Sequence, residues 1–364
     1  MSPEKASLLP KRSGKRSDYV LVVHGGAGTM SREGSTPEQQ AQYKAALTRA
    51  LYAGYAILAE GGEAMNASVA AVSSLEDCPL FNAGKGAVFN VGGKNELEAS
   101  IALSAPPASH PDIDPSRRGS SMTLLTHTRN PSHLARALYL APDSQVPHPM
   151  MSGAAAEEFA KSFGIELVDS EYFFTEKRWR EHRRGLGLPE DIPAGHKVEE
   201  TAPLLDLLPK GTVGAVALDV HGRIAACTST GGRTNKLVGR IGDTPIMGSG
   251  FWAEQWTVRG FLRRTWRKVK GTSRTEAMGV SGTGDGDNTA STIARRMQYL
   301  HEPLHVAAKW AVEDLRKAGG DGGVIGVDRA GHVAMELNCP GMYRGVIRQD
   351  GIPKTAIFAD DELE

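Results

Sequence analysis

The sequence predicts a layered α/β fold from three observations. Segments typical of strands occur in runs, and so do segments typical of helices. Two segments, 214–226 and 323–335, repeat one design: an apolar strand, a turn with Asp and Gly, and a second apolar strand. Nearly every strand residue in both is apolar, which indicates sheets covered on both faces. With 364 residues, the chain is long enough to build such a core.

The first strand is predicted at 19–23, an apolar run that leads directly into the glycine-rich segment 24–28. A dinucleotide-binding loop would need a third glycine where Ser31 stands, so that interpretation fails. The glycine-rich segment is then either a plain turn or a loop that brings backbone N–H groups close to a site.

Two helices are predicted after the glycine-rich segment. Thr36 is the expected N-cap of the first, with Pro37 in its first turn and Gln39 completing a capping box. The glycine pair 61–62 ends this helix, and the second helix is predicted over 64–75. The apolar stripe of the first helix consists of Tyr43, Leu47, Leu51 and Leu58.

The middle of the chain is predicted to alternate loops, strands and helices. A loop rich in Pro and Gly covers 75–86, and residues 104–118 form a proline-rich surface insert. Strands are predicted at 87–89, 96–103 and 122–126, and helices at 132–139 and 153–163. From 176 to 210 the pattern is lost, which predicts a mobile connector, and order returns at Gly211.

Composition argues against several classes of protein. The 42 basic and 42 acidic residues cancel, so nothing favours nucleic acid, whose binders carry a basic face. No stretch approaches the roughly 18 apolar residues of a membrane span. Three cysteines without a CxxC motif argue against a disulfide framework and for a reducing compartment. Segment 1–18 is polar and has no apolar core, so we expect a disordered leader on a cytoplasmic protein.

The segment His301-Glu302-Pro303-Leu304-His305 matches the zinc-protease pattern HExxH, which needs both histidines on one helix face. Pro303 argues against this, because proline inside a helix costs about 3 kcal/mol. We expect Pro303 at the start of a helix instead, with His301 outside it. The apolar stripe of that helix consists of Leu304, Ala308, Ala311 and Leu315.

Polar groups that suit amide hydrolysis follow the connector. Thr212 opens an apolar strand, where a threonine is usually only a strand former. Here it stands where a cleavable connector ends, after Gly211, whose carbonyl is open to attack. Hydroxyls, backbone N–H groups and one cation–anion pair suit hydrolysis of a zwitterionic amide. The candidates for these groups are the turn 228–232, Arg240, Asp243 and the turn 281–284.

Six motifs follow one another along residues 19–345. They are HGGAGT at His24, LEDCPLFNAGKGAVF at Leu75, ELEASI at Glu96, GTVGAVALD at Gly211, TSTGGRTNKLVGRIGDTPIMGSG at Thr228 and GTGDG at Gly282. In this order they resemble the plant-type asparaginase and isoaspartyl peptidase family, the threonine branch of the N-terminal-nucleophile hydrolases. The insert near Ser104 and another at 251–277 resemble those of fungal members.

The resemblance implies a four-layer αββα sandwich over residues 19–364 as a single domain. It also implies a precursor that cuts itself between Gly211 and Thr212, giving chains 1–211 and 212–364. The Thr212 α-amine would then act as general base for its own hydroxyl, since a free α-amine has a pKa of about 7.7–8.0. Asn82 is expected to orient the region around this nucleophile.

The same resemblance assigns the remaining roles in the site. Arg240 is expected to hold the substrate α-carboxylate, where its planar fork suits two oxygens, and Asp243 the α-ammonium. Thr230 is expected to tune the amine and hydroxyl of the nucleophile. Ser281 and Gly282 are assigned to the positions at which the family has the threonine and glycine of its oxyanion hole.

The implied reaction is hydrolysis of the side-chain amide of L-asparagine, of β-aspartyl dipeptides, or of both, with release of L-aspartate. No cofactor is implied beyond a structural sodium ion in the loop 75–85, for which a plain turn is the alternative. The backbone of that loop would bind the ion at Leu75, Glu76, Cys78, Phe81, Ala83 and Lys85. Processed α/β protomers would pair into a dimer.

The chain departs from the family pattern at two places. Glu98 stands where the family usually has Asp. After Gly286 an aromatic-rich segment of the family is missing, so the chain runs directly into a helix predicted at 292–300. A shortened link would pull on the oxyanion donors, which tolerate little displacement, and this predicts lower activity than in relatives.

Two rival interpretations stay open at this point. The shortened link favours a catalytically impaired family member that serves as a non-enzymatic binding or scaffold protein. Glycosylasparaginase is the rival among enzymes, but it usually enters the secretory route, and segment 1–18 has no signal-peptide core. The intact Thr212, Thr230, Arg240 and Asp243 favour the self-processing enzyme.

Overall fold

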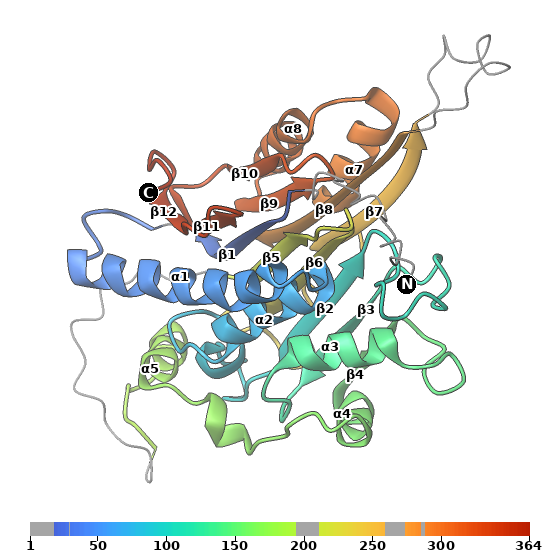
Figure 1. Ribbon diagram of the computed structural model, residues 1–364. Helices are drawn as coiled ribbons and strands as arrows, with labels where there is room; N and C mark the ends of the chain where they lie inside the picture. Colours follow the sequence, from blue (N-terminus) through green and yellow to red (C-terminus); the bar gives the residue numbers. More distant parts are fainter. Residues whose placement is uncertain (1–17, 29, 194–210, 259–273, 285–287) are drawn as a thin grey trace, which may run out of the picture.

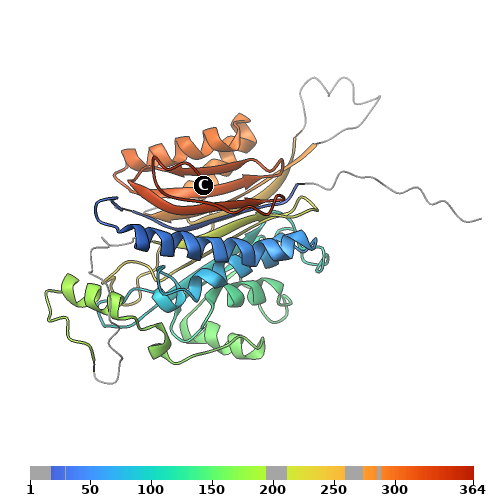
Figure 2. The same cartoon turned by 60° about the vertical axis from the view of Figure 1, so that its left-hand side comes forward.

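Two β-sheets pack face to face in this computed structural model, with helices on both outer sides (Figure 1). Figure 2 shows the four layers in order: helices, the smaller sheet, the larger sheet, and helices again. The predicted αββα sandwich is therefore confirmed. The structure describes residues 18–28, 30–193, 211–258, 274–284 and 288–364. The predicted leader, apart from Asp18, and residues 194–210 of the predicted connector lie outside this range.

The larger sheet has eight strands in the order β12-β11-β1-β5-β6-β2-β3-β4. They are β1 (Val20–Gly28), β2 (Leu97–Leu103), β3 (Gly119–Leu125), β4 (Met150–Ser152), β5 (Val213–Leu218), β6 (Ile224–Thr230), β11 (Gly341–Arg348) and β12 (Lys354–Phe358). Only β3 and β4 pair in parallel. Strands β1, β5 and β6 are buried at every residue, because helices cover one face and the smaller sheet the other.

The smaller sheet has four strands in the order β10-β9-β8-β7. They are β7 (Phe251–Val258), β8 (Arg274–Gly284), β9 (Gly322–Asp328) and β10 (Val333–Leu337). The two predicted hairpins are confirmed as β5–β6 in the larger sheet and β9–β10 in the smaller one. The insert predicted at 251–277 begins and ends in the long β7–β8 pair, and its residues 259–273 lie outside the described range.

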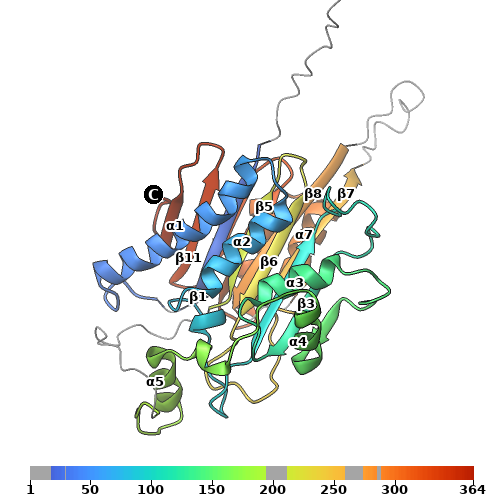
Figure 3. The same ribbon diagram turned by 60° about the horizontal axis from the view of Figure 1, so that its bottom comes forward.

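Helices cover the outer face of each sheet. Figure 3 looks onto those that cross the larger sheet. On that side lie α1 (Pro37–Ala59), α2 (Ala64–Glu76), α3 (Pro131–Leu140), α4 (Gly153–Ser162) and α5 (Glu176–Gly185), and on the other α7 (Thr289–Leu300) and α8 (Leu304–Lys317). The predicted capping box of α1 is present: Thr36 accepts from the Gln39 N–H at 3.2 Å, and the Gln39 side chain accepts from the Thr36 N–H at 2.9 Å. Among the described residues no helix is long and apolar enough to cross a membrane.

The glycine-rich segment 24–28 is not a loop, because β1 continues to its end. Strand β11 pairs with residues on both sides of a bulge between His24 and Ala27. Gly26 has a φ of +107°, and a Cβ there would lie 2.5 Å from the Cα of Gly211. The prediction of a turn was therefore wrong. The alternative, a backbone brought close to another segment, agrees with the contact between Gly26 and Gly211.

Residues 87–89, predicted as a strand, pair with no strand among the described residues. They follow a single 3-10 turn, η1 (Gly84–Gly86). The side-chain amide of Asn95 donates to the carbonyls of Ala87 at 2.9 Å and Val88 at 3.1 Å. These carbonyls therefore bond locally instead of to a neighbouring strand.

The first part of the predicted connector is helix α5, which the sequence pattern did not reveal. Its residues are polar on almost every face, so no apolar stripe marks it. Ion pairs one turn apart support it: Arg180 to Glu176 at 2.7 Å and Arg178 to Glu181 at 2.9 Å. Arg178 is only 1% exposed and donates from Nε to the Gly86 carbonyl at 2.8 Å, which docks the helix onto the core.

Candidate active site

Three neighbouring strands of the larger sheet place two threonines and a glutamate in one row. Val213 of β5 pairs with Ser229 of β6, so Thr212, the residue before β5, comes opposite Thr230. Strand β6 in turn pairs Thr230 with Glu98 of β2. All three side chains are buried and line one cavity. Side chains at the same level of adjacent strands point to the same face, which explains why they meet.

The cavity is small, about 30 Å³, and has room for one or two waters. Gly211, still joined to Thr212, forms part of its wall. The structure thus brings together the predicted nucleophile, the predicted cleavage site and two of the predicted substrate-binding residues, Arg240 and Asp243. The lining residues are Glu98, Gly211, Thr212, Thr230, Gly232, Arg233, Arg240, Asp243 and Gly284.

Ser281 and Gly282, predicted as the oxyanion hole, point elsewhere. The Ser281 hydroxyl lies 2.8 Å from His24 Nε2 and 2.8 Å from Thr228 Oγ1. The Gly282 N–H donates to the Gly250 carbonyl at 2.8 Å. Both groups bond inside the protein here, and their assignment to the oxyanion hole stays a prediction.

Thr283 lies two residues beyond Ser281, on the same face of β8, and it reaches Thr212, the predicted nucleophile. Its hydroxyl accepts from the backbone N–H of Thr212 at 3.2 Å. The hydroxyl of Thr244 lies 3.5 Å from that of Thr212 on the other side. Sequence reasoning missed both threonines, although each stands one residue away from a predicted site residue, Gly282 or Asp243.

His24 lies beneath the site rather than in it. Its complete burial lowers its pKa to about 3, so the imidazole is neutral near pH 7. A neutral ring has one donor and one acceptor nitrogen, and one of them is used on Ser281. His24 therefore packs and orients this region without bringing a charge to it.

Asn82 supports the turn that follows Thr230. Its side-chain amide donates to the Gly232 carbonyl at 2.6 Å, and its side-chain oxygen accepts from the Val88 N–H at 3.0 Å. Its backbone carbonyl accepts from the Gly231 N–H at 2.9 Å. The Gly232 N–H in turn donates to Thr230 Oγ1 at 2.9 Å. Asn82 thus fixes the turn next to the site and does not line the cavity itself.

The family model described as Asparaginase matches residues 17–258 and 271–357. The chain belongs to the asparaginase family. The match covers both sheets and every site residue named above.

Relatives of the asparaginase family match over nearly the whole chain. The isoaspartyl peptidase of Escherichia coli (strain K12) is 36% identical, over 94% of this chain and 96% of that protein. The probable isoaspartyl peptidase/L-asparaginase 2 of Arabidopsis thaliana is 31% identical, over 93% and 99%. The isoaspartyl peptidase/L-asparaginase of Mus musculus is 33% identical, over 88% and 86%.

In this asparaginase-family chain the HEPLH segment spans a break between two helices. His301 ends α7 with a φ of +57°, Pro303 precedes α8, and His305 lies inside α8. Pro303 was predicted as the first residue of this helix and lies one residue before it, as the N-cap, and the predicted stripe of α8 is buried. In the described part of the chain, no group of three or more His, Cys, Asp or Glu side chains could hold a metal ion.

The loop expected to hold sodium is a tight turn between α2 and η1. The Cys78 N–H donates to the Leu75 carbonyl at 3.2 Å, and the Phe81 N–H to the Cys78 carbonyl at 3.3 Å. The buried Glu76 carboxylate accepts from the Ser132 hydroxyl at 2.7 Å, and its burial raises its pKa to about 7. A carbonyl oxygen can accept twice, so these bonds leave the sodium assignment as a prediction.

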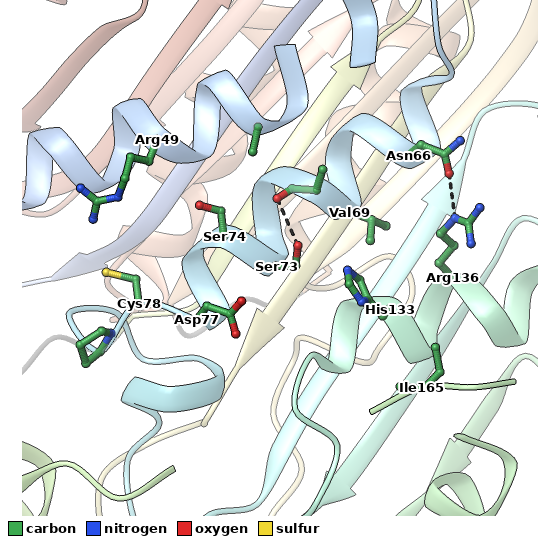
Figure 4. A pocket seen from close by; sticks show the side chains of 13 residues that line it. Arg49, Asn66, Val69, Ser73, Ser74, Asp77, Cys78, His133, Arg136 and Ile165 are labelled. Atoms are coloured by element: carbon green, nitrogen blue, oxygen red, sulfur yellow. Dashed lines mark hydrogen bonds between the residues drawn. The ribbon is translucent and has the colours of Figure 1, made fainter. Parts of the chain in front are cut away.

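A much larger hollow, about 850 Å³, lies on the outer helical side of the larger sheet (Figure 4). Residues of α1, α2 and α3 line it, among them Arg49, Asn66 and His133. Arg136 donates from Nε to Asn66 Oδ1 at 2.7 Å within it. The hollow contains none of the residues in the Thr212 cavity, so its size does not make it the active site.

Proposed function

We propose that the chain is a self-processing amidohydrolase. It hydrolyses the side-chain amide of L-asparagine, β-aspartyl dipeptides, or both, and releases L-aspartate. The observation that carries this proposal is the single cavity that holds Thr212, next to Gly211, with Thr230, Arg240 and Asp243. The names of the relatives, isoaspartyl peptidase and isoaspartyl peptidase/L-asparaginase, support the substrate class.

Self-cleavage comes first in the proposed sequence. The Thr212 hydroxyl attacks the Gly211 carbonyl, a C–O bond forms, and the C–N bond of the peptide breaks, which leaves an ester. Water then hydrolyses the ester and releases chains 1–211 and 212–364. The close approach of Gly26 to Gly211 supports this step, because it packs the scissile residue firmly against β1. Movement of the freed Gly211 end away from Thr212 would also open the small cavity to substrate.

Turnover uses the α-amine that cleavage creates. The amine takes the proton of the Thr212 hydroxyl, which attacks the side-chain carbonyl carbon of the substrate. Ammonia or an amino acid leaves, and water hydrolyses the resulting ester to L-aspartate. Thr283 already bonds the Thr212 nitrogen and is placed to tune that amine. We propose that Ser281 and Gly282 supply the oxyanion donors.

We also propose a dimer of processed protomers, a sodium ion in the loop 75–85, and a cytoplasmic location. The three free cysteines, Cys78, Cys227 and Cys339, support a reducing compartment. Light scattering after chromatography tests the dimer. The sodium ion is tested by thermal unfolding: the unfolding temperature should rise in a sodium salt but not in the matching choline salt. Cell fractionation tests the location.

The non-enzymatic alternative rested on the shortened link after Gly286. Helix α7 nonetheless begins at Thr289, earlier than predicted, and its first turn is anchored. The N–H groups of Ala290 and Ser291 donate to the carbonyls of Ser249 and Gly248, at 3.2 and 2.8 Å. No described residue therefore favours the impaired protein. Reduced activity through the short link stays a prediction, which an inserted Tyr-Phe-Ile-Arg segment would test.

The proposed function is tested with substrates and one substrate-binding variant. Purified protein is expected to release ammonia from L-asparagine, or L-aspartate from a β-aspartyl dipeptide. Arg240→Ala is expected to raise KM by about 100-fold while self-cleavage persists, because only the partner of the substrate carboxylate is lost. A fully cleaved protein that hydrolyses neither substrate would refute the proposal.

A further inference from the structure

The loop that carries Arg240 and Asp243 is held by side chains on alternate residues of a single strand segment. Alternate residues of a strand face the same side, so the three side chains act on one loop. The bonds run from the Gly239 N–H to Glu96 Oε1 and Oε2 at 3.1 and 3.2 Å, from the Gly242 N–H to Glu98 Oε1 at 2.9 Å, and from the Ser100 hydroxyl to the Thr244 carbonyl at 2.7 Å.

Glu98 differs from Glu96 because the loop engages only one of its two carboxylate oxygens. Its Oε2 atom is buried and has no hydrogen-bond partner among the residues that the structure describes. The side chain as a whole is 0% exposed, and it lines the Thr212 cavity. A buried carboxylate oxygen without a partner is costly, so a donor is expected to complete it.

The two nearest cations do not supply that donor. Lys236 donates from Nζ to the Glu96 carbonyl at 2.7 Å, and no ion pair within 4.0 Å joins it to Glu98. The Arg240 guanidinium and Glu98 Oε2 both approach Gly242: a Cβ there would be 2.8 Å from Arg240 Nη1 and 3.1 Å from Glu98 Oε2. No ion pair joins these two described side chains either.

A guanidinium and a carboxylate held near one point, but not paired, suit a ligand that carries both charges on one carbon. We infer that Glu98 is a specificity-determining residue whose Oε2 accepts the α-ammonium of the substrate, beside Asp243, while Arg240 holds the α-carboxylate. The inference rests on the proposed function. It also gives a purpose to the departure at this position, since a glutamate reaches further than the aspartate that the family usually has.

The experiment compares two ligands that differ only in the α-ammonium. Calorimetry measures the Kd of L-aspartate and of succinate with the processed protein. The ratio of the two constants reports recognition of the ammonium alone. Glu98→Gln keeps an oxygen for the Gly242 N–H but removes the charge, and the ratio is expected to fall at least tenfold. Glu96→Gln is the matched control: it acts on the same loop from outside the cavity, so it should weaken both ligands alike.

A second variant guards against a fold that does not tolerate a buried glutamine. Glu98→Asp keeps the negative charge but holds it further from the ligand, because the side chain is shorter. The ratio of the two dissociation constants in this variant is expected to lie between the ratios of the wild type and of Glu98→Gln. Thermal unfolding shows which variants are folded. An unchanged ratio in the folded variants would overturn the inference, and so would a wild type that does not bind L-aspartate.

These outcomes are separate from those of the proposed function. If L-asparagine is hydrolysed but the ratio does not respond to Glu98, the inference fails and the function stands. If the ratio responds but no substrate is hydrolysed, the ammonium site stands and the function fails. A parallel assay with succinamic acid, which has the amide but no α-ammonium, should show no loss of kcat/KM in Glu98→Gln beyond that in Glu96→Gln.

Discussion

The hairpins β5–β6 and β9–β10 turn in the same way. In the first, Asp219 accepts two backbone N–H groups of its own turn at 2.9 and 3.0 Å, and in the second Asp328 does so at 2.8 and 3.0 Å. A glycine follows in each turn, Gly222 with a φ of +73° and Gly331 with a φ of +81°. Local sequence therefore determines the same local structure twice.

The surroundings of the two hairpins differ. Hairpin β5–β6 lies between β1 and β2 in the middle of the larger sheet, whereas β10 is an edge strand of the smaller sheet. At the open end of the first hairpin, Thr212 and Thr230 face the cavity. Asp321 and Cys339 stand at the same positions along the second hairpin and line no part of that cavity. The segments around a hairpin, and not its own turn and strand pattern, therefore decide whether its residues line a site.

One glycine in each hairpin shows how the neighbours enter. A Cβ at Gly214 would clash with Ser281 Oγ and His24 Nε2, so this glycine makes room for a polar cluster. A Cβ at Gly323, the matching position, would lie 2.8 Å from the sulfur of Met342. The first hairpin is therefore built against polar groups, and the second against an apolar side chain.

The largest expected difference between the hairpins is in catalysis. Thr230→Ala is expected to lower kcat by about 100-fold or more, because its hydroxyl lies in the row with the nucleophile. Cys339→Ala, the matched change in the second hairpin, is expected to alter kcat less than about twofold, since surface and core changes away from a site act mainly on stability. Steady-state kinetics on L-asparagine measures both. Similar losses in the two variants would break the comparison.

A smaller difference is expected in stability. Asp219 is fully buried and also accepts from the Ala64 N–H at 3.1 Å, at the start of α2. Asp219→Ala would leave three donors unpaired, the buried Ala64 N–H among them, and is expected to lower the free energy of unfolding by about 2–3 kcal/mol. Asp328→Ala is expected to lower it by about 1 kcal/mol, because its turn reaches solvent. Denaturant unfolding measures both, and equal losses would show that burial is not decisive.

The last expected effect concerns pH. Burial lowers the pKa of His24 to about 3, whereas the unfolded chain has the ordinary value near 6.5. The unfolded state therefore binds a proton first as the pH falls. His24 contributes its full stability above pH 6.5, and this is lost as the pH falls from 6.5 toward 3.

The test for His24 is a comparison of unfolding free energies between pH 7 and pH 4. The wild type is expected to lose up to about 1.4 kcal/mol more per pH unit than His24→Gln in that window. Hairpin β9–β10 offers the control: Met342→Leu, beside Gly323, should leave the wild-type slope unchanged. If the free energy of unfolding falls equally steeply with pH in the wild type and in His24→Gln, the result would contradict the account.

Local patterns in the sequence predicted much of the fold. The two hairpins, the capping box of α1 and the proline before α8 all depend on residues close together in the chain. Helix α5 was missed because its stability comes from ion pairs and from the docking of Arg178 onto Gly86. The continuation of β1 was missed because only its pairing with β11 makes a strand of a glycine-rich segment.

The candidate site was predicted in the same uneven way. Thr212, Arg240 and Asp243 carry distinctive chemistry within motifs, and the structure brings them to one cavity. The contacts of Ser281 and Thr283 could not be predicted from the sequence, because neighbours on one face of β8 can be distinguished only by what lies opposite them. Ser281 meets His24, and Thr283 meets the nucleophile.

Mass spectrometry of the purified protein tests the central claim most directly. The account predicts two chains, with the smaller beginning Thr-Val-Gly-Ala at Thr212, and a Thr212→Ala variant that stays whole and loses activity by about 10⁴-fold or more. The larger chain should end at Gly211 with a free C-terminal carboxylate. A cut at another bond, or a Thr212→Ala variant cleaved as fully as the wild type, would contradict the account.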